Sequence, residues 1–138
     1  MQILYTTTAH ATGDGRNGHV QSDDGIIDAD VRVPKEMGGT GGATNPEQMF
    51  AAGYAACFHS ALRFVAGQEG VDTTGTEVSA SVSIGSLDTG GFGLAVELDV
   101  SVPAVDRPTA EALVARAHEV CPYSNATRGN IEVALAVV

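Results

Sequence analysis

The most apolar segment of the chain runs from Asn45 to about Gly67, and its pattern predicts a helix that is hydrophobic on nearly every side. Asn45 suits the N-cap of this helix, Pro46 stands at its first position, and Gln48 follows three residues after the cap. Polar residues interrupt the apolar surface only late in the segment, at Ser60, Arg63 and Gln68. Such a helix has to be buried on several sides, and a chain of 138 residues can hardly surround it alone. We therefore expect a homodimer in which sheets from both chains cover the helix.

A second helix is predicted over residues 107–120, because its apolar side chains share one face and Pro122 cannot continue it. Strands are predicted from β-branched runs and turn signals, over residues 2–12, 17–22, 26–33, 76–86, 94–103 and 131–138. The turn sequence Asp23-Asp24-Gly25 predicts a hairpin between the second and third of these strands. The order is βββ-α-ββ-α-β, so the predicted fold class is α+β with mainly antiparallel sheets, in one domain spanning residues 1–138.

The composition is that of a globular protein with an acidic surface. The chain has 17 Asp and Glu residues against 7 Lys and Arg residues, which gives a net charge of −10. An acidic surface repels phosphate backbones and anionic lipids, so we expect neither a nucleic-acid partner nor a membrane partner. Residues 1–8 lack the basic region and the long apolar run of a signal peptide, and we expect a cytoplasmic protein. In that reducing compartment, a disulfide is more often catalytic than structural.

The two cysteines, Cys57 and Cys121, occupy different settings in the predicted helices. Cys57 lies in the middle of the apolar helix, where a free cysteine often serves only as a small buried apolar residue. Cys121 lies at the end of the second helix, directly before Pro122, where the chain has to turn. A thiol inside a helix and a thiol at a helix end suit a peroxide-reducing pair, in which one reacts and the other resolves. For a disulfide, their Cα atoms have to approach within about 7 Å.

Two motifs carry a resemblance to a known family: NPEQMFAAGYAACF at residues 45–58 and VCPYSNATRGN at residues 120–130. Both resemble the organic hydroperoxide resistance branch of the OsmC/Ohr family of thiol peroxidases, and the resemblance extends over nearly the whole chain. It implies the OsmC-like fold, in which the sheets of an intertwined homodimer wrap around a buried central helix. It also implies that Cys57 is the peroxidatic residue, that Cys121 resolves it, and that residues 124–130 form a packed turn supporting the site.

Activation of Cys57 requires a nearby cation. Burial among apolar side chains should raise its pKa, although only the thiolate attacks a peroxide. The helix dipole cannot lower that pKa much, because Pro46 lies 11 residues earlier, a distance of about 16 Å. The resemblance points to Arg16 as the cation, while the alternative is a solvated loop arginine. Glu47 is the natural partner of Arg16, and its alternative role is that of a first-turn acid interacting with the helix dipole.

The position of Glu47 has a consequence for the assembly. It precedes Cys57 by ten residues, which is about 15 Å along a straight helix. If Glu47 orients an arginine against a reactive sulfur, that sulfur should belong to another chain. We therefore expect composite active sites, with Arg16 and Glu47 of one subunit facing Cys57 and Cys121 of the other.

The expected function is the reduction of organic hydroperoxides, fatty-acid hydroperoxides included, through a Cys57 sulfenic acid and a Cys57–Cys121 disulfide. The resemblance implies that a dithiol, in the form of dihydrolipoyl groups, regenerates the enzyme. No motif for flavin, nicotinamide or haem and no metal-binding spacing is present, and we expect no cofactor. Two alternatives stay open: an OsmC-type peroxidase with a different peroxide preference, and a non-enzymatic redox sensor or ligand-binding module.

Overall fold

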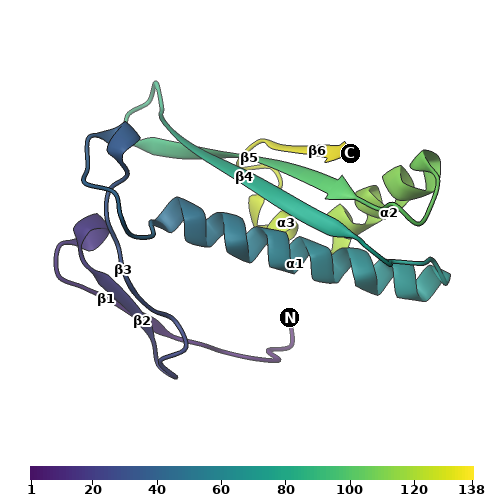
Figure 1. The fold of residues 1–138 in the computed structure, drawn as a ribbon, viewed down its shortest axis with the longest axis horizontal. Helices are drawn as coiled ribbons and strands as arrows, with labels where there is room; N and C mark the ends of the chain where they lie inside the picture. The colour runs from purple at the N-terminus through teal and green to yellow at the C-terminus, as the bar shows by residue number, and fades with distance from the viewer. The chain divides into compact units, whose positions relative to one another are not determined.

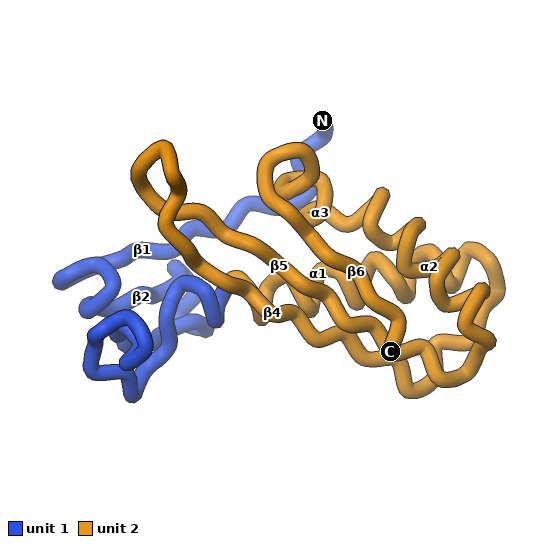
Figure 2. Tube along the Cα trace, turned by 90° about the horizontal axis from the view of Figure 1, so that it is seen from above, with its two compact units in different colours: residues 1–49 blue, residues 50–138 orange.

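The computed structural model describes residues 1–138 and divides them into two compact units, residues 1–49 and residues 50–138 (Figure 2). The first unit contains a small sheet and two single-turn 3₁₀ helices. The second contains the main sheet, most of the long helix α1 (Pro46–Glu69) and two further helices. None of the helices is long and apolar enough to cross a membrane.

The sheet of the first unit is antiparallel, in the order β1-β2-β3. Its strands are β1 (Ala9–Thr12), β2 (His19–Ser22) and β3 (Asp28–Asp30), and its 3₁₀ turns are η1 (Gly15–Asn17) and η2 (Lys35–Met37). The predicted hairpin is confirmed, because the chain turns at residues 23–25 between β2 and β3. The strand predicted over residues 2–12 is wrong for its first seven residues, which pair with no strand because β2 ends opposite Ala9.

This first unit has little apolar interior. Val31, at 1% exposure, is its only buried apolar side chain. Large apolar side chains are instead exposed along it: Met1, Ile3, Leu4, Tyr5, Ile26, Ile27 and Met37. These side chains lie outside the three strands, and a small unit that exposes this much apolar surface needs a further covering surface to be stable.

The main sheet of the second unit has the order β4-β5-β6. Its strands are β4 (Glu77–Ser86) and β5 (Phe92–Ser101), which are antiparallel, and β6 (Val133–Val137), which runs parallel to β5. Between β5 and β6 the chain forms α2 (Arg107–Val120) and the short α3 (Pro122–Thr127). The predicted order of elements and fold class are confirmed, with α3 as an addition, since Pro122 ends α2 and also begins a new helical turn (Figure 1).

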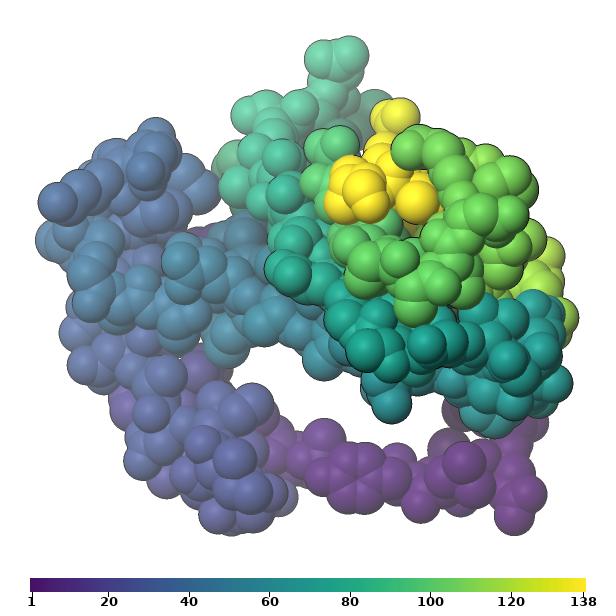
Figure 3. Space-filling model, turned by 45° about the vertical axis from the view of Figure 1, so that its right-hand side comes forward, coloured from purple at the N-terminus to yellow at the C-terminus, as the bar shows by residue number.

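The core of the second unit lies between one face of this sheet and the helices α1 and α2 (Figure 1). Alternate residues of β5 point inward, and they meet apolar side chains of both helices: Val96, Leu98, Val100, Tyr54, Phe58, Leu62, Val65, Leu113 and Ala117. The space-filling view shows α2, in green, packed directly against the C-terminal half of α1, in teal (Figure 3). The helices are therefore fixed to the sheet by ordinary apolar packing.

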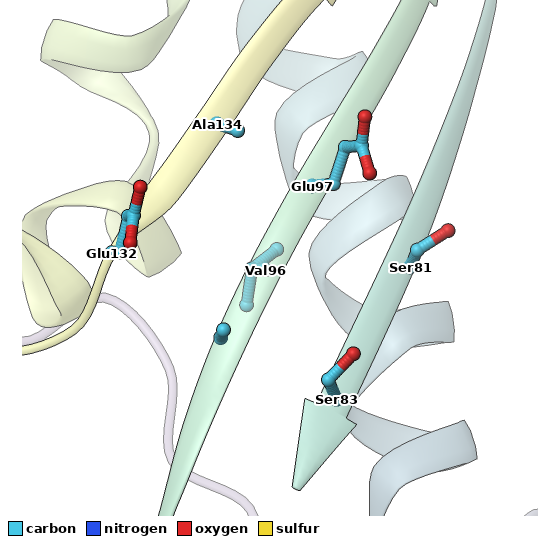
Figure 4. Close-up of a pocket in the computed structure, with 7 residues that line it drawn as sticks. Ser81, Ser83, Val96, Glu97, Glu132 and Ala134 are labelled. Atoms are coloured by element: carbon cyan, nitrogen blue, oxygen red, sulfur yellow. The ribbon is translucent and has the colours of Figure 1, made fainter. Parts of the chain in front are cut away.

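The opposite face of the sheet is exposed and carries small or acidic side chains. A shallow hollow on this face is lined by Ser81, Ser83, Ala95, Glu97, Glu132 and Ala134, together with Val96, whose side chain is buried in the core (Figure 4). The alternation of exposed and covered residues along β4 and β5 produces this division, because successive side chains of a strand point to opposite faces.

Helix α1 is buried on one side only within its own chain. At intervals of four residues, Ala52, Ala56, Ser60 and Phe64 form an exposed stripe along it, and Phe64 is 60% exposed. The sequence predicts a helix buried on several sides, and a single chain leaves this stripe uncovered. Burial of the stripe by a second chain stays a prediction.

Candidate active site

The structure brings the two predicted cysteines together. Cys57 lies half-buried on α1, and Cys121 is fully buried as the single residue between α2 and α3. Their Sγ atoms are 3.7 Å apart, and both thiols are free. A disulfide bond of about 2 Å needs the two sulfur atoms to approach by less than 2 Å, which a modest backbone adjustment provides.

Its surroundings make Cys57 a weak acid. Burial raises the pKa of the Cys57 thiol, and the neighbouring Cys121 sulfur raises it further, whereas the backbone amide of Tyr123 acts in the opposite direction. The raised pKa means that little thiolate is present at neutral pH without help from a cation. The activation problem expected from the sequence is therefore present in the folded second unit.

Arg16 and Glu47 form an ion pair within the first unit. Arg16 Nη1 donates to Glu47 Oε2 at 2.8 Å, and Arg16 Nη2 donates to Glu47 Oε1 at 2.7 Å. The hydrogen bond to Glu47 raises the pKa of Arg16, and the bond from Arg16 lowers the pKa of Glu47. Both groups are therefore charged at neutral pH. This two-point contact fixes the plane of the guanidinium and leaves further N–H donors available, since an arginine has five.

Local sequence places each member of this pair. Gly15, directly before Arg16, has a φ of 59°, a left-handed conformation that favours glycine, so the chain turns tightly into η1. Asn45 Oδ1 accepts a hydrogen bond from the Gln48 backbone amide at 2.9 Å, which confirms Asn45 as the cap of α1. The cap fixes the first turn of the helix, and Glu47 lies in that turn.

A buried hydrogen-bonded cluster next to Cys121 was not predicted from the sequence. Tyr54 Oη on α1 lies 2.9 Å from Ser124 Oγ and 3.1 Å from Thr127 Oγ1, both on α3. On α2, His118 Nδ1 lies 2.8 Å from the same Ser124 Oγ. A sequence signal was present, because Ser124 and Thr127 are three apart in a helical turn and share one face. We call these four residues the hydroxyl cluster.

Aromatic packing joins α3 to α1 beside the cysteines. The ring of Tyr123 packs against Tyr54 and Phe50, with centroid distances of 5.6 and 6.0 Å. Gly53 permits this contact, because a Cβ at position 53 would lie 2.8 Å from Tyr123 Oη and 3.2 Å from a ring carbon. The absence of a side chain at Gly53 therefore lets Tyr123 lie across α1.

The other histidine near the cysteine is engaged elsewhere. His59 Nε2 lies 2.8 Å from Thr76 Oγ1, at the chain segment leading into β4. No group of three or more His, Cys, Asp or Glu side chains is arranged to hold a metal ion. The chemistry that the geometry offers is that of a dithiol.

Comparisons with known proteins agree with this geometry. The family model described as OsmC-like protein matches residues 39–136. An organic hydroperoxide resistance protein of Xanthomonas axonopodis pv. citri is 51% identical over 138 residues, covering 99% of this chain and 96% of that protein. The crystal structure of an organic hydroperoxide resistance protein from Legionella pneumophila superposes with a TM-score of 0.95 and 52% identity, covering 99% of this chain and 98% of that one. A counterpart from Elizabethkingia anophelis gives a TM-score of 0.95 and 54% identity, with the same coverage.

Proposed function

Because the chain belongs to the OsmC-like family, in its organic hydroperoxide resistance branch, we propose that it is a cysteine-based peroxidase that reduces organic hydroperoxides. Fatty-acid hydroperoxides are among the proposed substrates. The observation that carries the proposal is the pair of free thiols, Cys57 and Cys121, with sulfur atoms 3.7 Å apart. Such a pair can take up two electron equivalents of oxidation and store them as a disulfide.

The proposed disulfide forms in two steps, an oxidation by the peroxide and a condensation that releases water. The Cys57 thiolate attacks the distal peroxide oxygen, the O–O bond breaks, and the alkoxide leaves and takes up a proton to become the alcohol. Cys57 is then a sulfenic acid. The Cys121 sulfur attacks Cys57 Sγ, the S–O bond breaks, and the hydroxyl group leaves as water with the proton of Cys121. A dithiol reductant reopens the resulting disulfide, and the electrons come from thiols throughout, without a metal or cofactor.

In this proposal Arg16 supplies the charge that stabilises the Cys57 thiolate, and Glu47 orients Arg16. The raised pKa of Cys57 supports the need for such a cation. The guanidinium is held in one plane by Glu47, and its remaining donors can bind the sulfur and a peroxide oxygen. Glu47 lies ten residues before Cys57 on α1, or about 15 Å by helical rise, so the assisting arginine is assigned to the other subunit.

The proposed assembly is accordingly a homodimer with composite sites, each built from Arg16 and Glu47 of one chain and Cys57 and Cys121 of the other. Two features support it: the exposed stripe along α1 and the apolar surface that the first unit leaves uncovered. A second copy of the chain covers both at once. Small side chains such as Ala52 and Ala56 allow close approach of two helices.

We propose dihydrolipoyl groups, carried on a protein or as free lipoamide, as the reductant, and the cytoplasm as the compartment. The experiment measures peroxide consumption by the pure protein, with cumene hydroperoxide or hydrogen peroxide as substrate. Reduced lipoamide and thioredoxin serve as alternative donors. Rapid turnover of cumene hydroperoxide with lipoamide is expected. Preferred turnover of hydrogen peroxide indicates an OsmC-type peroxidase of different preference, and a single turnover without regeneration by any dithiol indicates a redox sensor.

A further inference from the structure

The hydroxyl cluster is unusual because polar atoms lie inside an apolar core. Tyr54 and Ser124 are completely buried, and Thr127 is 5% exposed. A buried hydroxyl without a partner costs about 1–3 kcal/mol, so a core that needed only packing would be served as well by Phe and Ala at these positions. No buried side-chain polar atom in this structure lacks a partner. The cluster is thus fully satisfied, and this makes its geometry specific.

The proton positions in the cluster follow from its contacts. Thr127 Oγ1 lies 3.0 Å from the Tyr123 carbonyl and 3.2 Å from the Ser124 carbonyl, and both can only accept, so the Thr127 hydroxyl donates to the backbone. Tyr54 then donates to Thr127, Ser124 donates to Tyr54, and His118 donates to Ser124 through Nδ1–H. Burial and the charge of Arg128 lower the pKa of His118, so the neutral Nδ1–H form is the relevant one. This is the one arrangement that satisfies all four contacts together.

These contacts surround Cys121, the proposed resolving residue. Cys121 is the only residue between α2 and α3, with an extended backbone at φ −64° and ψ 124°. The hydrogen bond between His118 on α2 and Ser124 on α3 spans this junction. Arg128 spans it as well, by donating to the His118 carbonyl. The angle between the two helices, and with it the position of Cys121 Sγ, is therefore fixed from both sides.

The cluster also connects this junction to the helix of the reacting cysteine. Tyr54 lies three residues before Cys57 on α1, so their side chains share one side of that helix. Its hydroxyl binds α3 through Ser124 and Thr127. One tyrosine hydroxyl therefore ties together α1 and α3, the helix that begins directly after Cys121.

We propose that Tyr54, Ser124 and His118 are positioning residues for the resolving step, in which Cys121 attacks the Cys57 sulfenic acid. The inference rests on the proposed peroxidase function and extends it. By keeping the two sulfur atoms close, the cluster favours disulfide formation over a second peroxide attack, which converts the sulfenic acid to sulfinic acid. The proposal gives the cluster no part in the first attack, because its hydrogen bonds join Tyr54, Ser124, Thr127 and His118 to one another and to the Tyr123 carbonyl, and none of them involves Cys57 Sγ.

The test uses the full-length protein with Tyr54→Phe, which keeps the ring and removes the hydroxyl. Ser124→Ala is the second variant and Ser124→Thr its conservative counterpart, which keeps a hydroxyl. Thr76→Val is the matched control, because it removes the hydroxyl that pairs with His59 outside the Cys121 junction. Circular dichroism and urea unfolding identify the variants that fold. If Tyr54→Phe does not fold, the comparison of Ser124→Ala with Ser124→Thr decides the result.

The first measurement follows one reduced protein batch mixed with cumene hydroperoxide, quenched with acid and analysed by intact mass. In Tyr54→Phe and Ser124→Ala, loss of the first thiol should proceed at the wild-type rate, while disulfide formation slows by roughly three- to tenfold, as expected for one lost hydrogen bond. The sulfinic acid fraction at a given peroxide concentration should rise by the same factor. Ser124→Thr should form the disulfide faster than Ser124→Ala, and Thr76→Val should form it at the wild-type rate. Folded variants that form the disulfide at the wild-type rate overturn the proposal.

The second measurement needs no peroxide and separates this inference from the proposed function. The dithiol is equilibrated with oxidised and reduced glutathione, so that each disulfide formed converts one oxidised glutathione into two reduced molecules. The cluster variants should shift this equilibrium toward the dithiol by roughly three- to tenfold relative to wild type and Thr76→Val. An unchanged equilibrium overturns the positioning role even in a protein that reduces peroxides. A shifted equilibrium in a protein without peroxidase activity supports the positioning role and refutes the peroxidase.

Discussion

Arg16 meets Glu47 through two parallel hydrogen bonds of 2.8 and 2.7 Å, with the arginine side chain 39% exposed and the carboxylate 13% exposed. The contact joins a glycine-rich turn to the first turn of α1, and these segments are 31 positions apart in the sequence. The pair is partly buried, and its two parallel hydrogen bonds hold the guanidinium in one plane. The remaining edge of the guanidinium is available to an anion.

Substitution of Arg16 tests this role. Arg16→Ala should raise the pKa of Cys57 by roughly 1–3 units and slow the first peroxide attack by orders of magnitude. Arg16→Lys should recover only part of the rate, because an ammonium group cannot form the planar two-point contact with Glu47. The Cys57 pKa and the rate of the first attack in Glu47→Ala should lie between those of the wild type and Arg16→Ala. The pH dependence of thiol alkylation and single-turnover kinetics provide the measurements, and a normal Cys57 pKa in Arg16→Ala would point to a different cation.

Substitutions of Cys57 and Cys121 should affect peroxide reduction in different ways. Cys57→Ser should abolish peroxide reduction, because the reacting sulfur is lost. Cys121→Ser should consume about one equivalent of peroxide and then stall, or proceed to sulfinic acid at Cys57. Stopped-flow peroxide assays and intact mass distinguish these outcomes. A fast first turnover in both variants contradicts the assigned roles.

The composite site can be tested by mixing inactive subunits. Light scattering should first give twice the chain mass of 14.1 kDa at micromolar concentration. After subunit exchange between Arg16→Ala and Cys57→Ser dimers, one site in each mixed dimer has all its residues, so about a quarter of the wild-type activity should return. Labelled subunits establish that exchange has occurred. No recovery after complete exchange would place each site within one chain.

His19 should make the stability of the protein pH-dependent above pH 6.5. Its ring nitrogens lie 2.9 Å from Asp30 Oδ1 and 2.6 Å from Asp28 Oδ1, and hydrogen bonds to Asp30 first and Asp28 second raise the pKa of His19 above its ordinary 6.5. The stabilisation is therefore complete below pH 6.5 and is lost as the pH rises through the raised value. His19→Gln should remove this loss. Urea midpoints at pH 6 and pH 8.5 measure it, and a small, salt-sensitive effect is expected because the group is exposed.

Helix ends were predicted well, because capping residues and prolines act on the residues next to them in the sequence. The capping residue Asn45 and the following Pro46 located the start of α1, and Pro122 located the end of α2. The predicted strand over residues 2–12 failed because strand length depends on the partner, and β2 offers only four residues. The single domain spanning residues 1–138 and the homodimer stay predictions.

The candidate site was predicted only in part. The cysteines were predicted from their helical positions together with the motif resemblance, Arg16 from the resemblance, and Glu47 as the natural partner of Arg16. The structure places the members of each pair in contact. The hydroxyl cluster was missed, because its members lie 70 positions apart in the case of Tyr54 and Ser124. No periodicity in one segment reveals such a contact, although a tyrosine in an apolar helix requires a distant partner for its hydroxyl.

Gly53 limits how far α1 can be stabilised by replacing its glycines. Replacing glycine by alanine inside a helix commonly stabilises a protein by about 0.5–1 kcal/mol. At Gly67, where an added Cβ meets no atom within 4 Å, that gain should appear as a higher melting temperature. At Gly53 the same change would displace Tyr123, whose backbone amide lowers the pKa of Cys57. Two glycines of one helix thus differ in the substitutions that they tolerate. Gly67 can be replaced in a search for thermostable variants, whereas a side chain at Gly53 would disturb the surroundings of Cys57.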